Sequence, residues 1–307
     1  MSIQAESIYV EILIRGHMED LWRLTQTPDL HERWDLRFTN ITYLPRLDEA
    51  QPQRFLYSTR LGFGLKIQGE GESVGNRTDS QGQRTSALKF WSNDPKSLIR
   101  EGTGYWKYIP IDDRVRFVTG YDYQVRFGAL GRVFDALIFR SLIDWATAWS
   151  FDRLRLWIEK GIDPAISLQR SLIHGLARLT LAFVWLYHGA IPKLIYQHPD
   201  ELTMLLGAGV PIESALILLN FIGWAEVSYG VLFLLAWRTR GLFLVNIALM
   251  LLATFGVALN SPQYLVAAFN PVTLNVLVIA LSLVGFLSST DLPSARRCRR
   301  KRPEGQS

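Results

Sequence analysis

Two hydrophobic patterns divide this chain of 307 residues. Up to about residue 165, apolar residues alternate with polar ones or recur at three- and four-residue steps, as in a soluble domain. From about 171 to 288, Leu, Val, Ile, Ala and Phe dominate in long stretches. We therefore expect a soluble domain over residues 1–165, a membrane domain over 166–290 and a short tail over 291–307.

The N-terminal half is predicted to be an α+β domain. Residues 6–14 alternate well enough for a strand, and the helical pattern after His17 is broken at Pro28. A long helix from Leu130 to Lys160 closes the domain, because bulky residues recur along it at helical spacing. Turn signals separate six further runs with strand character, at residues 38–45, 53–61, 64–74, 84–92, 98–110 and 113–127.

The second half contains four apolar runs, each close to the ~20 residues that a helix needs to cross a bilayer. The alternative, a soluble helical bundle, requires a polar stripe on every helix. The third run offers only Asn246 and Thr254 as polar residues, so the pattern favours an all-α four-helix transmembrane bundle. The four runs are Leu172–Ile195, Ala215–Trp237, Gly241–Leu259 and Pro271–Leu287.

The basic residues predict the orientation of these spans. They gather before the first span, in the connection between the second and third spans, and after the fourth, whereas the other two connections hold only Lys193. Basic residues favour the cytoplasmic side of a membrane. We therefore expect the spans to cross a bacterial-type inner membrane, with both termini in the cytoplasm. The residues concerned are Arg153, Arg155, Lys160, Arg170, Arg178, Arg238, Arg240 and the six of the tail.

Charge and cysteine content narrow the function classes. Part of the net charge of +5 comes from the tail sequence ARRCRRKR, which follows an apolar run and is interpreted as a membrane-face anchor, so no nucleic-acid partner is expected. Cys298 is the only cysteine, which excludes an internal disulfide and a thiolate metal site. The N-terminus shows no pattern of a cleavable signal.

The strand order and the segment LWRLTQTPDLHERWD resemble the SRPBCC, or START-like helix-grip, family. The resemblance covers residues 5–160 and implies a cavity for a hydrophobic ligand between the sheet and the long helix. Aromatic residues on strands usually fill a core, so packing is the competing interpretation for each candidate. The glycines of GFGLKIQGEGE are interpreted as allowing a curved strand, since no helix follows them as in a nucleotide site. The cavity candidates are Trp34, Tyr57, Trp91, Tyr105, Trp106, Tyr121 and Tyr123.

Glu226 lies near the middle of the second apolar run, where an ionised carboxylate costs at least a few kcal/mol. Gly223 and Gly230 share its helical face and predict the close approach of another helix. An ion pair with Arg178 is feasible from their depths. We predict an intramembrane polar site that is either structural or binds a ligand, a quinone or a proton, formed by Arg178, His188, Asn220, Glu226 and Asn275.

Residues 170–290 strongly resemble the DoxX-like membrane family, in which an acidic residue lies between glycines of the second span, as Glu226 does here. The resemblance implies an architecture and transfers no catalytic step. Lys193 and Glu201 are expected at the ends of a short extracytoplasmic loop, where they fix span ends or meet a headgroup. Asn270 and Pro271 predict the N-terminus of the fourth helix.

These features favour a binding or accessory membrane protein, with a cytoplasmic hydrophobic-ligand domain tethered to a DoxX-like bundle. Its expected partner is a membrane lipid or a small hydrophobic molecule. The alternative is a quinone-linked oxidoreductase component with a redox partner subunit, since the sequence shows no cofactor motif or metal site of its own. A third hypothesis is a ligand sensor whose bundle serves only as an anchor. Whether the chain is an enzyme stays open.

Overall fold

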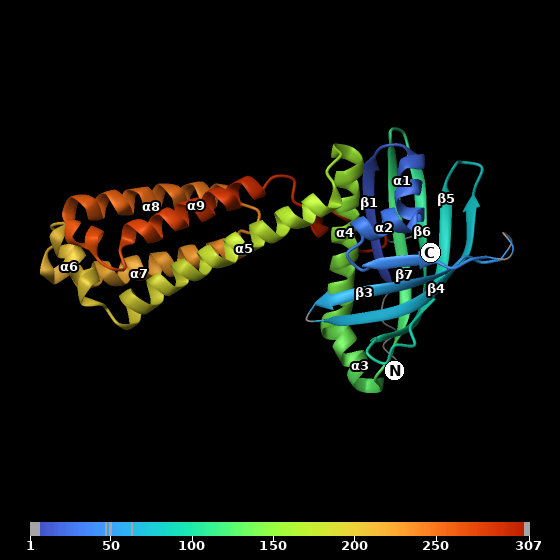
Figure 1. Ribbon diagram of the computed structural model, residues 1–307, viewed down its shortest axis with the longest axis horizontal. Helices are drawn as coiled ribbons and strands as arrows, with labels where there is room; N and C mark the ends of the chain where they lie inside the picture. Colours follow the sequence, from blue (N-terminus) through green and yellow to red (C-terminus); the bar gives the residue numbers. More distant parts are fainter. Residues whose placement is uncertain (1–6, 47, 49–50, 63, 304–307) are drawn as a thin grey trace. The chain divides into compact units, whose positions relative to one another are not determined.

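The computed structural model describes residues 7–46, 48, 51–62 and 64–303 (Figure 1). The chain forms two compact units. Unit 1 comprises residues 1–167 together with 293–307, and unit 2 comprises residues 168–292.

Unit 1 is built on a seven-stranded antiparallel sheet with the order β1-β7-β6-β5-β4-β3-β2. The predicted strands are confirmed, because each alternating run supplies one row of side chains to each face of the sheet. Pro28 ends α1 as predicted and also occupies the first turn of α2. The elements are β1 (Ile8–Arg15), α1 (Met18–Gln26), α2 (Pro28–Trp34), β2 (Asn40–Tyr43), β3 (Arg54–Gly62), β4 (Leu65–Thr78), β5 (Arg84–Trp91), β6 (Ile99–Ile111) and β7 (Arg114–Val125).

The long helix predicted from Leu130 to Lys160 is also present, but it is not uniform. It consists of α3 (Gly128–Phe134), the π-helical turn η1 (Asp135–Phe139) and α4 (Arg140–Lys160). Gly161 has φ 64° and ends α4 in the left-handed conformation that glycine adopts without a steric penalty. The helix packs on β1 and α2, which gives unit 1 its α+β, helix-grip architecture.

The basic tail differs from the sequence prediction. Instead of forming a separate membrane-face segment, residues 293–303 pack within unit 1 and include the short helix η4 (Ala295–Arg297). Arg299 pairs with Glu11 of the edge strand β1 through two backbone hydrogen bonds of 2.9 Å. On α4, Asp152 accepts a hydrogen bond from the Ser294 backbone N–H at 2.7 Å, and buried Cys298 donates to the Ala148 carbonyl. The tail therefore covers part of a sheet edge, and burial raises the pKa of the Cys298 thiol.

Unit 2 is helical. Its elements are α5 (Pro164–His188, from Leu168 onward), the π-helical segment η2 (Gly189–Ile195), α6 (Pro199–Gly207), α7 (Ile212–Leu235), α8 (Gly241–Asn260), η3 (Pro262–Val266) and α9 (Pro271–Ser288). Asn270 caps α9 by accepting the Thr273 N–H, as predicted.

Among the described residues, α7, α8 and α9 are long and apolar enough to cross a membrane. The first predicted span, Leu172–Ile195, falls on the second part of α5 and on η2. Pro192 lies inside η2 and lacks the N–H that a regular helix needs, which accounts for the irregular turn at that point.

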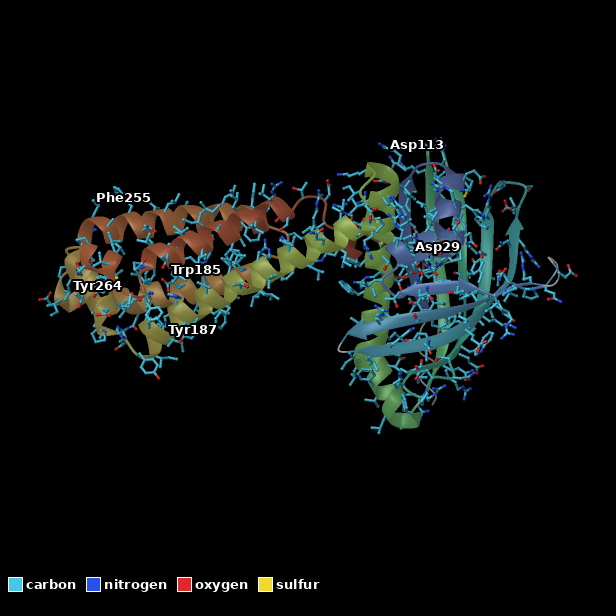
Figure 2. The ribbon with its side chains drawn as sticks, in the orientation of Figure 1. Asp29, Asp113, Trp185, Tyr187, Phe255 and Tyr264 are labelled. Carbon is cyan, nitrogen blue, oxygen red and sulfur yellow. The ribbon has the colours of Figure 1, made fainter. Side chains whose placement is uncertain are left out.

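The helices of unit 2 share one apolar core. It is formed by Ala177, Leu181, Ala182 and Trp185 of α5, Phe233 of α7, Phe243 of α8 and Val278 of α9. Trp185 lies among the helices and donates to Asn246, whereas Phe255 points to their outer surface (Figure 2). Asn246 in turn donates to Ser282. Hydrogen bonds therefore link Trp185, Asn246 and Ser282, which lie on three different helices, inside this core.

Candidate functional site

The inner face of the sheet, which faces α2 and α4, is dominated by aromatic side chains. Toward β1, this layer is closed: Phe117 of β7 stacks on Phe151 of α4 with ring centroids 4.4 Å apart, and Trp34 is fully buried. The Tyr121 hydroxyl lies 2.9 Å from that of Thr147, a residue of α4. Aromatic side chains therefore fill the space between α4 and this part of the sheet, as in a packed core.

The other end of the same face is more open. We call the aromatic floor the set of partly exposed aromatic residues on the inner face of β2, β3 and β5, namely Tyr43, Phe55, Tyr57 and Phe90. Ring centroids of neighbours in this row are 6.2 Å apart for Tyr43 and Phe55 and 6.5 Å for Phe55 and Tyr57. Burial raises the pKa of Tyr57 to about 12.

Glycines on the neighbouring strands make room for these rings. A Cβ at Gly69 would lie 2.3 Å from the Tyr57 ring, and one at Gly71 would lie 2.3 Å from the Phe55 ring. Gly102 of β6 has the same relation to Phe90, at 2.4 Å. The glycines predicted to allow strand curvature therefore let aromatic rings lie flat against the sheet.

A buried ionic cluster lies beside the floor. The Asp35 carboxylate accepts hydrogen bonds from Arg37 Nε at 2.9 Å and Nη2 at 2.6 Å, and His31 Nε2 lies 3.0 Å from it. Phe38 follows Arg37 and makes an edge contact with Tyr57. Burial acts to raise the pKa of Asp35, but the charge and hydrogen bonds of Arg37 and His31 outweigh it and hold the pKa well below its usual range. The sequence alone does not reveal this cluster, because its residues look like ordinary surface charges.

The cavity candidates divide between core, floor and outer face. Trp34, Trp106, Tyr121 and Tyr123 are buried core residues, and Tyr57 belongs to the aromatic floor. The prediction is wrong for Trp91 and Tyr105. Strand register pairs Trp91 with Glu70 and Tyr105 with Gly120, so both side chains lie on the outer face of the sheet. The position of a residue along its strand decides which face its side chain occupies, and composition does not show this position.

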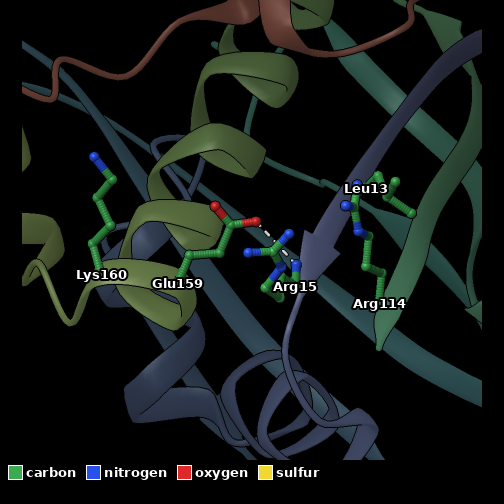
Figure 3. Close-up of a pocket in the computed structure, with 5 residues that line it drawn as sticks. All are labelled: Leu13, Arg15, Arg114, Glu159 and Lys160. Carbon is green, nitrogen blue, oxygen red and sulfur yellow. Dashed lines mark hydrogen bonds between the residues drawn. The ribbon is translucent and has the colours of Figure 1, made fainter. Parts of the chain in front are cut away.

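One surface pocket of unit 1, of about 390 Å³, has a different character (Figure 3). It is lined by Leu13, Arg15, Arg114, Glu159 and Lys160. Glu159 accepts a hydrogen bond from the Arg15 backbone N–H at 2.9 Å. Four of the five lining residues are charged, so this pocket is not the expected hydrophobic-ligand cavity.

Unit 2 holds a second candidate site around Glu226 of α7. Lys193 of η2 places its Nζ 3.2 Å from Glu226 Oε2 and 3.0 Å from Oε1 of Glu201 on α6. The Lys193 side chain is 8% exposed and that of Glu226 is 16% exposed. Oε2 of Glu226 is buried and receives no hydrogen bond from the described residues, so the ion pair is its main compensation.

Small residues bring the two halves of this site together. A Cβ at Gly189 would lie 2.5 Å from the carbonyl oxygen of Gly223, and one at Gly230 would lie 3.0 Å from that of Ala182. The prediction that glycines allow a close helix approach is confirmed, and the approaching elements are η2 and α5. At this close approach, Lys193 reaches Glu226 in the middle of α7.

The proposed pairing of Arg178 with Glu226 is wrong. Arg178 is fully buried and donates to the carbonyls of Phe233 at 3.1 Å and Thr239 at 2.6 Å. It thus satisfies carbonyls at and beyond the end of α7, where a cation also complements the helix dipole. His174, one turn earlier, accepts from Arg178 Nε and was missed because a lone His in an apolar run carries no clear signal.

The other predicted members of the intramembrane site are separate. Asn220 accepts from Gln197 at 3.3 Å, and Asn275 donates to Thr254 at 2.9 Å. His188 lies beside Tyr187 and, in the part of the chain that the structure describes, forms no hydrogen bond with Glu226. The site is therefore formed by Glu226 together with Lys193 and Glu201, the two residues predicted to flank a short loop. Lys193 lies on η2 and Glu201 on α6, on either side of the connection formed by residues 196–198.

The apolar helices of unit 2 and the α+β unit 1 define a membrane protein with an appended helix-grip domain. The chain belongs to the same family as the uncharacterized membrane protein YndG of Bacillus subtilis (strain 168), with 38% identity over 301 residues, covering 98% of this chain and 99% of that protein. Residues 182–283 match the DoxX-like family, which identifies unit 2 as a DoxX-like domain.

Solved structures resemble the N-terminal half. TTHA0849 from Thermus thermophilus is 16% identical, with a TM-score of 0.37, covering 50% of this chain and 100% of that one. A STAR-related lipid transfer protein fragment from Xanthomonas axonopodis is 13% identical, with a TM-score of 0.37, covering 52% and 97%. The Zhui aromatase/cyclase from Streptomyces sp. R1128 is 11% identical, with a TM-score of 0.36, covering 51% and 97%.

Proposed function

We propose that this protein is a membrane-anchored binding protein whose N-terminal unit takes up an apolar ligand from the bilayer or delivers it there. The observation that carries this proposal is the aromatic floor. Its rings lie on the inner face of the sheet, where side chains normally pack, yet none of them is fully buried and Tyr43 is 44% exposed. An apolar guest that covers them gains about 25 cal/mol for each Å² of apolar surface buried.

The membrane unit supplies the anchor, and we propose that it crosses the bilayer four times with both termini in the cytoplasm. The second part of α5 supports a fourth crossing, because large apolar side chains on it face outward and suit contact with lipid. They include Leu172, Leu176, Leu179 and Phe183. The distribution of basic residues described above supports the orientation.

Removing the Tyr57 ring is expected to weaken ligand binding about tenfold, or ~1.4 kcal/mol, which corresponds to the loss of roughly 55 Å² of apolar contact at about 25 cal/mol per Å². The experiment uses the full chain in nanodiscs and titrates a fluorescent long-chain fatty acid into wild type and Tyr57→Ala.

The matched control is Leu56→Ala, since Leu56 is the neighbouring residue of β3 and lies on the outer face. Equal affinity of the two variants would contradict a site on the aromatic floor. Lack of probe binding by folded wild type, checked by hydrogen exchange, would overturn the proposed function.

The site in unit 2 favours a second candidate, a quinone-binding component. Lys193 is a hydrogen-bond donor suited to a quinone carbonyl, and it forms an ion pair with Glu226, whose Oε2 receives no hydrogen bond from the described residues. Photolabelling with an azido-quinone in native membranes is expected to fall at least about fivefold in Glu226→Gln, because the change removes the charge that holds Lys193. Unchanged labelling in a folded variant would remove this candidate.

A further inference from the structure

The first part of the long helix carries an apolar surface that the fold of unit 1 does not cover. We call the α3–α4 face the set Leu130, Phe134, Leu137, Ile138, Leu142 and Trp145. Leu130 is 83% exposed and Leu137 is 73% exposed. Most of these residues recur at three- and four-residue steps, so they form one stripe along α3, η1 and the start of α4.

The opposite side of this helix is firmly held to the sheet. Asp135 is buried and accepts a hydrogen bond from the Tyr123 hydroxyl at 2.6 Å, and Phe139 makes an edge contact with the same tyrosine. Two turns into α4, the Thr147 hydroxyl lies 2.9 Å from the Tyr121 hydroxyl. Because these contacts fix the sheet-facing side, the α3–α4 face points away from the core and is available to a partner.

The charges around the face indicate what this partner is. Over residues 126–149 the basic residues are Arg126, Arg132 and Arg140. The two carboxylates of the same segment are already compensated, Asp135 by Arg140 at 3.1 Å and Asp144 by Arg300 of the tail at 3.2 Å. Of these arginines, Arg132 is exposed, whereas Arg140 pairs with Asp135 and Arg126 donates to the carbonyls of Ser92 and Asp94. A broad Trp, Phe and Leu surface with an exposed arginine on the same helix is the composition of a helix that lies in the headgroup region of a bilayer.

The covalent structure adds a second argument. Only residues 161–163 separate α4 from α5, whose later part belongs to the membrane unit. The α3–α4 face begins at Trp145, 15 residues or about 22 Å of helix before the end of α4 at Lys160, and extends to Leu130, about 45 Å away. A surface within this reach of a membrane domain meets lipid at a high effective concentration, so a modest intrinsic affinity is enough for docking. We propose that the α3–α4 face docks on the surface of an anionic lipid leaflet and lies in its headgroup region.

The test is spin-label accessibility in the full chain. Cys298→Ala removes the only cysteine, and Ile138→Cys then places a label on the α3–α4 face. In phosphatidylcholine vesicles with about one third phosphatidylglycerol, a composition that supplies the negative surface potential, we expect collisions with an aqueous nickel chelate to fall at least about fivefold relative to a label at Val74→Cys. Val74 is an exposed residue of β4. Collisions with oxygen, which partitions into lipid, are expected to rise at Ile138→Cys.

One further variant and two changes of condition test the electrostatic contribution to docking. Arg132→Glu is expected to restore much of the chelate access, as should pure phosphatidylcholine vesicles or high salt. Full chelate access at Ile138→Cys in the anionic vesicles would overturn the proposal. Protection from both chelate and oxygen would also overturn it, because that result indicates a protein partner such as a second copy of this chain. Neither result bears on the fatty-acid titration, so this inference and the proposed function fail independently.

Discussion

Replacing Lys193 by Met is expected to destabilise unit 2 by about 3–5 kcal/mol, the cost of removing one partner from a buried ion pair. Lys193 is the cation between Glu201 and Glu226, at 3.0 Å and 3.2 Å. Without it, two carboxylates face each other in an apolar surrounding, and Oε2 of Glu226 loses its main compensation. The measurement is the free energy of unfolding of the full chain in detergent micelles, with Lys66→Met as a control at an exposed lysine.

A double variant distinguishes electrostatics from lost packing. Lys193→Met combined with Glu226→Leu removes both charges, and it is expected to recover about 1–3 kcal/mol relative to Lys193→Met alone. A double variant that is no more stable than the single one would show that the lysine acts through its packing and that the ion pair contributes little. A Lys193→Met protein as stable as the Lys66→Met control would contradict the role of Lys193 altogether.

The sequence predicted the fold of unit 1 well because strand and helix periodicity are local signals. All the expected strands formed, since each alternates over its own length, and the long helix appeared where bulky residues recur. The tail was misinterpreted because a basic run after an apolar segment looks like a membrane anchor. The two backbone hydrogen bonds between Arg299 and Glu11 join residues far apart in the chain and leave no trace in local pattern.

The candidate sites were predicted only in part, because local patterns reveal some of their residues and not the contacts between distant segments. Glu226 was recognisable as a buried acid between glycines, and the glycine contacts explain the close packing at this point. Its partner Lys193 was not recognised, because it looks like a loop residue in the sequence. In the structure, Lys193 lies with Gly189 and Pro192 on the irregular helical segment η2, which packs against α7. The aromatic floor depends on strand parity and register, so composition alone placed Trp91 and Tyr105 on the wrong face.

Asp35→Asn is expected to lower the stability of unit 1 by about 3 kcal/mol near neutral pH, since it leaves the Arg37 guanidinium without its carboxylate. The Asp35 side chain is 0% exposed, and that of Arg37 is 13% exposed. Hydrogen exchange of the full chain, followed in peptides from residues 20–45, is expected to show protection reduced by about a hundredfold in this segment, because each tenfold change corresponds to about 1.4 kcal/mol.

The pH dependence supplies an independent check on the same ion pair. Because the folded-state pKa of Asp35 is depressed, its contribution to stability is present above the unfolded-state pKa of about 3.9 and is lost as pH falls through the lower, folded-state pKa. Other carboxylates titrate in the same range, so the informative quantity is the difference between wild type and Asp35→Asn. We expect this difference to shrink as the pH falls from about 4 to 3, where the unfolded chain takes up the proton and the folded protein does not. A difference that stays constant or grows from pH 4 to pH 3 would mean that Arg37 does not hold Asp35 in its ionised form.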